Sequence, residues 1–257
     1  MHTVRSQTTI LTKNFIFATV IILSIASCTT VYVPNARNSP LFKKGGEFQG
    51  SVHLGPIPSE TAIDAQAAVS VTKHLALMGN FSYAEPDKDR RDQDKYHRHK
   101  FAEGAIGYFT NYRKWCYEIF AGYGKGEGSG YDQIVLFNTT TEFKATGKFT
   151  RFFIQPAAGL NVKAMNIAFA PRISLVDFKE FRGDNAMDTQ VVEDNPKIFI
   201  EPAVIGRFNF MKDRMFCSFQ GGVCLRTSTV NYDYRRFNGF LGFGFRIGGT
   251  KKQENTY

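Results

Sequence analysis

The chain has few cysteines, and their spacing suggests neither a metal site nor a disulfide framework. Four cysteines occur in 257 residues, with no CxxC pair and no matching Cys/His spacing. A structural zinc site is therefore not expected, and we predict no metal and no cofactor. Cys217 and Cys224 lie at an odd spacing in one predicted strand, so their side chains point to opposite faces and should not form a disulfide.

Long apolar runs are also missing. The longest run, residues 15–26, is interrupted by Thr19 and Ser24, and it is shorter than the roughly 20 apolar residues that a membrane-spanning helix needs. Arg5 and Lys13 precede it, no acidic residue lies upstream, and small residues close it. This layout is typical of a bacterial secretory signal, so residues 1–27 are predicted to be removed on export.

Catalytic motifs and nucleic-acid-binding motifs are absent. The sequence contains no GxSxG, HExxH or GxxxxGK. His97 and His99 lie in the charged stretch 85–100, which we interpret as a solvated loop, and general acid–base catalysis needs positioned groups. We therefore predict no catalytic residues and no enzyme. The chain carries 32 Lys+Arg against 23 Asp+Glu, but the basic residues are scattered, which favours a solvated surface or a face toward anionic lipid head groups over nucleic acid.

What the sequence does contain is a period of two. In "FLGFGFRI" near the C-terminus, Leu241, Phe243 and Phe245 fall on one face of a strand, and the glycines and Arg246 fall on the other. No segment of comparable length carries a helical stripe, so the chain is predicted to be all-β. The same alternation occurs in ten segments: 47–54, 62–71, 74–83, 101–110, 115–124, 148–162, 165–177, 197–208, 214–226 and 238–247.

The links between these segments alternate strictly between short and long. Four links have only a few residues, whereas 84–100, 125–147, 178–196 and 227–237 are long and polar. Short periplasmic turns and long external loops are typical of transmembrane barrels, so we predict an antiparallel up-and-down β-barrel of about ten strands. An even strand number returns both ends of the barrel to the periplasmic side, where we also expect an N-terminal anchor. Link 125–147 is expected to form a projecting hairpin that packs on a neighbouring loop or contacts a partner protein.

The two faces of the segments predict where lipid and lumen lie. Aromatic residues near segment ends suit a lipid–water interface: Tyr83, Tyr108, Trp115 and Tyr117. The opposite face is predicted to line a narrow lumen, mostly filled by side chains, with a network of ten charges. Its members are Glu47, Asp64, Glu103, Glu118, Arg151, Arg172, Glu201, Arg207, Arg226 and Arg246. The alternative exchanges the faces and gives a soluble, lipocalin-like barrel with an apolar interior.

The end of the signal adds a resemblance. Ile25-Ala26-Ser27-Cys28 resembles the lipobox of bacterial lipoproteins, in which the cysteine thiol is acylated and becomes the first residue of the mature chain. Together with the strand pattern, the chain resembles the small outer-membrane β-barrel proteins of Gram-negative bacteria, in a lipoprotein version. The resemblance implies a signal peptide (1–27), palmitate-type acylation of Cys28 with an extended tether (28–45), a barrel (46–248) and a polar tail (249–257).

We accordingly predict a non-enzymatic protein of the cell envelope, lipid-anchored through Cys28 in the outer membrane, with a structural, surface-contact or small-solute-passage role. Expected partners are outer-membrane lipids, the envelope assembly machinery and a protein bound by the loops. The alternative is a periplasmic, lipid-anchored, lipocalin-like barrel that binds an apolar ligand. The sequence leaves open the oligomeric state and whether the tether plugs the lumen.

Overall fold

The computed structural model describes residues 30–57, 60–85, 95–136, 139–162, 164–185, 188–189, 195–228, 230 and 232–248. The signal sequence, Cys28 and the tail after Gly248 lie outside these residues. The described part is all-β, and no helix in it is long and apolar enough to cross a membrane.

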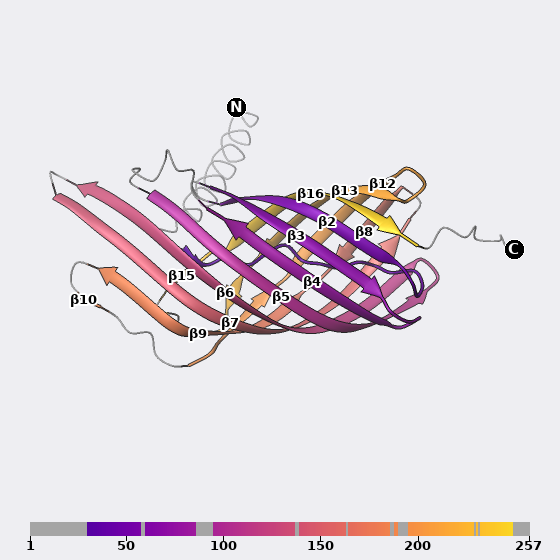
Figure 1. Ribbon diagram of the computed structural model, residues 1–257, viewed down its shortest axis with the longest axis horizontal. Helices are drawn as coiled ribbons and strands as arrows, with labels where there is room; N and C mark the ends of the chain where they lie inside the picture. The colour runs from indigo at the N-terminus through magenta and orange to yellow at the C-terminus, as the bar shows by residue number, and fades with distance from the viewer. Residues whose placement is uncertain are drawn as a thin grey trace, which may run out of the picture.

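One antiparallel barrel closes with ten strand positions, as the sequence predicted (Figure 1). Each position in the ring is filled either by one strand or by two strands in line. Each position pairs with its neighbours in the chain, and β16 pairs with β2 to close the ring. Seven positions are single strands: β2 (Phe48–Ile57), β3 (Glu60–Ser70), β4 (Leu75–Ala84), β5 (Lys95–Tyr112), β6 (Trp115–Leu136), β7 (Thr139–Asn161) and β16 (Phe237–Ile247).

The other three positions are each built from two strands in line. They are β8 (Met165–Phe169) with β9 (Arg172–Asn185), β11 (Lys197–Glu201) with β12 (Ala203–Phe210), and β13 (Met215–Val223) with β14 (Leu225–Arg226). Pro171 and Pro202 stand at the first two breaks. Proline has no N–H to donate to the next strand, so the ladder is interrupted there.

Links 84–100 and 178–196, predicted as loops, contain a great deal of strand, which corrects the loop prediction, whereas link 125–147 forms the projecting hairpin that was predicted. β5 already begins at Lys95, β6 and β7 stay paired as far as Leu136 and Thr139, and β9 continues to Asn185, where β10 (Asp188–Thr189) folds back on it. We call this extension of β5, β6, β7 and β9 the wall, and it projects beyond the other strands in Figure 1. Apolar alternation ends there because the outward residues become charged, while backbone pairing continues.

The outer surface of the barrel is apolar over the height of a membrane. On β6 the outward residues are apolar or aromatic from Trp115 to Tyr123, and Lys125 begins the charged part. That stretch matches the roughly 9–11 residues with which a tilted strand crosses a bilayer. The barrel is therefore a membrane barrel with its apolar face toward lipid. The lipocalin-like alternative is wrong, because the large apolar side chains of the strands are exposed on the outside, whereas charged and polar side chains are buried inside beside phenylalanines and alanines.

Candidate functional site in the barrel lumen

The lumen is occupied by the chain's own N-terminal segment. Every residue from Thr30 to Phe42, which we call the plug, is buried. Its first residues form β1 (Thr30–Tyr32), which pairs in parallel with β15 (Asp233–Tyr234) from the link before β16. The question of a plugged lumen, which the sequence left open, is thereby answered for the described residues.

Contacts along β7 establish the direction of the plug. The ring of Tyr32 lies 5.4 Å from that of Phe149, and Asn35 accepts a 2.7 Å hydrogen bond from Arg151. Further along, the carbonyl of Asn38 accepts a 2.7 Å hydrogen bond from the Gln155 amide, and a Cβ added at Gly159 would overlap the Leu41 side chain. The plug therefore runs from the wall end of the barrel to the end with the short turns.

The plug has an extended backbone whose polar groups are matched by side chains of the lumen. Pro34 and Pro40 disfavour a helix, so its N–H and C=O groups are not paired with one another in helical hydrogen bonds. Strand side chains supply partners instead. The N–H of Ala36 donates to Asp64 (2.5 Å), that of Arg37 to Gln220 (2.9 Å) and that of Leu41 to Glu118 (3.0 Å), while the carbonyl of Ala36 accepts from Gln66 (2.9 Å).

A cluster of buried charges holds the middle of the plug. Arg37 of the plug forms a 2.7 Å ion pair with Glu201, and both side chains are almost completely buried. Glu103 pairs with Arg151 and, at 3.5 Å, with Arg172. Asn35 joins this pair of arginines to the acid, since its amide nitrogen donates to Glu103 while its oxygen accepts from both guanidinium groups. Buried charges are tolerated only when they are paired in this way.

A second cluster holds the lower end of the plug. Glu118 accepts hydrogen bonds from the Ser39 hydroxyl and the Leu41 N–H. Arg207 donates to the carbonyl of Ser39 (2.6 Å), and Arg246 donates to that of Pro40 (3.3 Å). Two arginines thus donate to backbone carbonyls of the plug, and both also reach the side-chain oxygen of Gln49.

The predicted charge network is distributed as follows. Nine of its ten members are buried: Glu47, Asp64, Glu103, Glu118, Arg151, Arg172, Glu201, Arg207 and Arg246. Burial raises the pKa of Glu47, which lies just before β2. Arg226 was placed wrongly. It is exposed, because the chain leaves the row of β13 at Cys224 and continues in β14, which pairs with β11.

Arg37 is the functional residue that the sequence analysis missed. It is the fifth buried arginine facing five buried acids, the place that had been given to Arg226. One signal was available in the printed sequence, because residues 29–45 contain no acid for this arginine to pair with. Alternating glycines on the inward face of β6 were a second signal, since they leave space for other groups. A Cβ on Gly128 would overlap the carbonyl oxygen of Val31 in the plug.

The predicted interface aromatics all lie on the outside of the barrel. Tyr83, Tyr108, Trp115 and Tyr117 are each between 37% and 48% exposed. Trp115 begins β6 at the short turn, whereas Tyr83 lies near the wall end of β4. They therefore flank the apolar surface at both edges, the positions that amphipathic rings occupy at membrane interfaces.

Two histidines lie where the sequence analysis did not expect them. His97 and His99 were predicted on a solvated loop, but they belong to β5 and are buried, because their alternating register turns both inward. The Nε2 atom of His99 lies 2.6 Å from the Ser82 hydroxyl, the start of a nucleophile–base arrangement. In the described residues nothing hydrogen-bonds the Nδ1 atom of His99, so no orienting group completes it. Nor could any described group of three His, Cys, Asp or Glu residues hold a metal ion.

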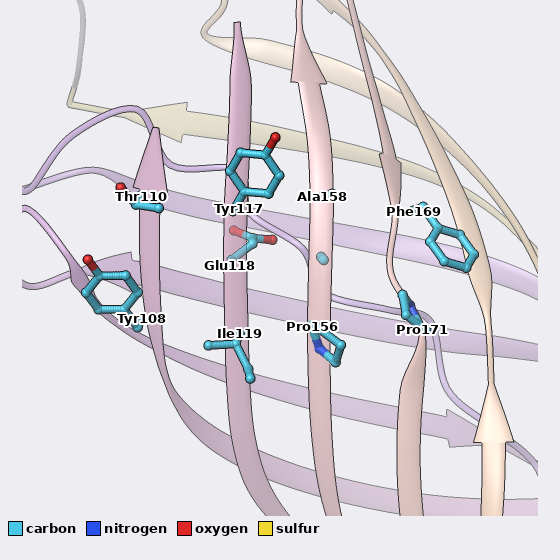
Figure 2. A pocket seen from close by; sticks show the side chains of 10 residues that line it. Tyr108, Thr110, Tyr117, Glu118, Ile119, Pro156, Ala158, Phe169 and Pro171 are labelled. Atoms are coloured by element: carbon cyan, nitrogen blue, oxygen red, sulfur yellow. The ribbon is translucent and has the colours of Figure 1, made fainter. Parts of the chain in front are cut away.

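An apolar pocket of about 480 Å³ opens on the outer surface. It lies where β7 changes partner from β8 to β9, because Pro171 interrupts the neighbouring ladder. Figure 2 shows Tyr108, Ile119 and Phe169 on separate strands around it, and Glu118 reaches it from the lumen side. Its lining suits an acyl chain of the surrounding bilayer better than a polar substrate.

Comparisons with known proteins give distant likenesses at the level of the barrel. No protein-family model matches the chain, and no curated protein matches it in sequence. Among solved structures, the translocator domain of the autotransporter NalP from Neisseria meningitidis matches 86% of this chain and 89% of its own, with 9% identity and a TM-score of 0.45. LpxR from Salmonella typhimurium matches 79% of this chain and 100% of its own (6% identity, TM-score 0.36). A major outer membrane protein from Thermus thermophilus matches the same shares of the two chains, with 9% identity and a TM-score of 0.35.

The strand pairing and the apolar outer face therefore describe a barrel of the outer-membrane type. The prediction that the chain is not an enzyme is corrected. LpxR is among the matched barrels, and the barrel architecture gives no ground for excluding an enzyme. The low identity transfers no activity from LpxR to this chain.

Proposed function

We propose that this chain is an outer-membrane lipoprotein whose barrel is kept closed by its own N-terminal segment and whose wall makes contacts at the cell surface. The observation that carries the proposal is the complete burial of residues 30–42 inside the barrel, with their backbone matched by lumen side chains. A role in free passage of solutes fits this arrangement poorly. The lipid attachment itself rests on the lipobox resemblance around Cys28.

The lumen side chains support a permanent plug over one that slides freely. If the plug left, Glu201 would lose Arg37, and Arg207 and Arg246 would lose the carbonyl oxygens of Ser39 and Pro40. Leaving a buried charge without its partner costs about 3–5 kcal/mol. Water entering the emptied lumen would recover part of that cost, so an opened barrel is a wetter and less stable barrel.

The outer face of the wall supports a role in surface contact. Immediately beyond the apolar band its exposed side chains are mainly basic: Arg98, Lys100, Lys125, Lys144, Lys148 and Arg182, against Glu127 and Glu180. Of these, Lys148 is paired with Glu180 at 2.9 Å and Arg98 with Glu85 at 3.1 Å. This is the height at which anionic lipid head groups surround a barrel, and basic residues near such a surface are attracted to it. We propose those head groups as the contact.

Conductance measurements test the closed lumen. In planar bilayers the full-length mature chain should give no stepwise current, whereas a variant lacking residues 30–42 should give discrete channel openings. Heat-modifiable migration on gels checks that the variant still forms a barrel, and a Lys144→Ala variant of the wall should remain as closed as the wild type. Steady channels of the same size in the wild type and the deletion variant would contradict the proposal.

A further inference from the structure

The plug passes through the barrel in a direction that decides where an anchor on Cys28 can lie. Its first residues are at the wall end. Val31 lies against Gly128 of β6, beyond Tyr123, where the outward apolar stretch of that strand ends. Its last residues are at the turn end, where the Asn111 amide donates to the Phe42 carbonyl at 3.0 Å, next to the turn between β5 and β6. The order is the same along β6 and β7.

The wall end of the plug is held firmly in the barrel mouth. Thr30 pairs with Asp233 and Tyr32 with Tyr234, and the N–H of Arg235 donates to the Tyr32 carbonyl at 3.0 Å. The ring of Tyr32 also packs between those of Phe149 and Phe199, at 5.4 and 5.0 Å, and its hydroxyl donates to Glu201 at 2.6 Å. Reversal of the plug would break all of these contacts.

Chain length then excludes the leaflet at the turn end. Cys28 precedes Thr30 by two residues, and two extended residues span about 7 Å. The apolar band of such a barrel is about 25 Å tall. We infer that the acyl chains of Cys28 insert into the leaflet at the wall end. Because short turns mark the periplasmic side, that leaflet is the outer one.

The inference rests on the proposed lipidation of Cys28 and gives it a location. It differs from the expectation that the anchor shares the periplasmic side with the ends of the barrel. A Cβ added at Gly248 would overlap the Gly46 carbonyl oxygen, so the two barrel ends do meet at the turn end. The plug carries the residues before Gly46 back through the lumen. The partner of the anchor is thus the acyl region of the outer leaflet, reached from the barrel mouth.

The test uses two full-length variants that carry the same short protease site with a glycine-serine spacer. One has it between Thr29 and Thr30, and the matched control has it after Lys212 in an exposed turn between β12 and β13. Cells are labelled with radioactive palmitate, and the protease is added to intact cells. We expect the first barrel to lose its label and the second to be cut only after the outer membrane is permeabilised. Heat-modifiable migration confirms that both variants are folded.

The outcomes separate the two proposals. If the site at Thr30 is cut only in permeabilised cells, the inferred direction of the plug is overturned. A Cys28→Ala variant is the control and should take up no palmitate. If the wild-type barrel also takes up none, the proposed lipidation fails, and the inferred location of the anchor fails with it. In that case the protease would still report which side of the membrane the N-terminus occupies, through a change in the mass of the barrel.

Discussion

At the scale of single residues, the charges of the lumen have meaning only in pairs. Arg37 and Glu201 are both almost fully buried and lie 2.7 Å apart, while Lys148 and Glu180 form a pair of similar length on the exposed wall. Water screens the exposed pair, so it contributes little to stability. The buried pair is shielded from water, so removing one partner leaves an uncompensated charge inside the barrel.

An Arg37→Ala variant should therefore be less stable by about 3 kcal/mol or more, because Glu201 loses its ion pair and keeps the neutral hydroxyl of Tyr32 and thiol of Cys224 as donors. The free energy of unfolding in urea, measured in detergent micelles, gives this difference. Lys148→Ala is the matched control and should unfold almost as the wild type does. Equal stability of the two variants would mean that the plug does not contribute Arg37 to the lumen.

Sequence reasoning at this scale worked where alternation continued and failed where it stopped. Strand register alone turns Glu103, Arg151 and Arg172 inward, so their burial was predictable. Arg226 follows the same alternation in the sequence, but the change from β13 to β14 at Cys224 removes it from the inward-facing row of side chains. Arg37 lies in a segment without alternation, and only the absence of a nearby acid hinted that its partner comes from elsewhere.

At the scale of elements, the strands are longer than their apolar pattern. β6 has 22 residues and β7 has 23, yet the outward apolar stretch of β6 ends at Tyr123. The sequence predicts the part that crosses lipid, because lipid selects apolar side chains at every second position. It predicts the wall only where link 125–147 forms a hairpin. At the start of β5 and the end of β9, charged residues replace the apolar ones, and only backbone hydrogen bonds show that the strand continues.

The basic outer face of the wall should bind anionic lipid. Neutralising Lys100, Lys125 and Lys144 to Gln removes three exposed charges, each worth about 1 kcal/mol near an anionic surface, so the affinity should fall by about a hundredfold. Titration of the barrel in neutral detergent with fluorescent phosphatidylglycerol measures it, with phosphatidylcholine as the lipid control. A Glu127→Gln variant should shift the affinity the opposite way. An unchanged affinity in the triple variant would remove the wall from the contact.

At the scale of the whole molecule, the barrel is incomplete without the segment that precedes it. In the described part of the chain, five buried acids face five buried arginines only when Arg37 is counted, and the inward face of β6 is closed only when Val31 lies on Gly128. Strand pairing accounts for the ring, and residues 30–42 fill its lumen together with inward side chains such as Phe120 and Phe153. The plug is therefore a part of the fold in addition to the ten strand positions, and most of it is an extended segment inside the barrel.

A plug of this kind should also work when it is supplied separately. A synthetic peptide of residues 30–45, added to the deletion variant in a planar bilayer, should block its conductance, because the barrel presents the partners of Ala36, Arg37 and Leu41 in a fixed order. A peptide with Arg37→Ala should block at least tenfold less tightly, since it leaves Glu201 unpaired. A scrambled peptide of equal charge separates sequence recognition from simple attraction. If the scrambled peptide blocks as well as the native one, the lumen selects for charge alone, and the ordered hydrogen bonds of the plug do not set its direction.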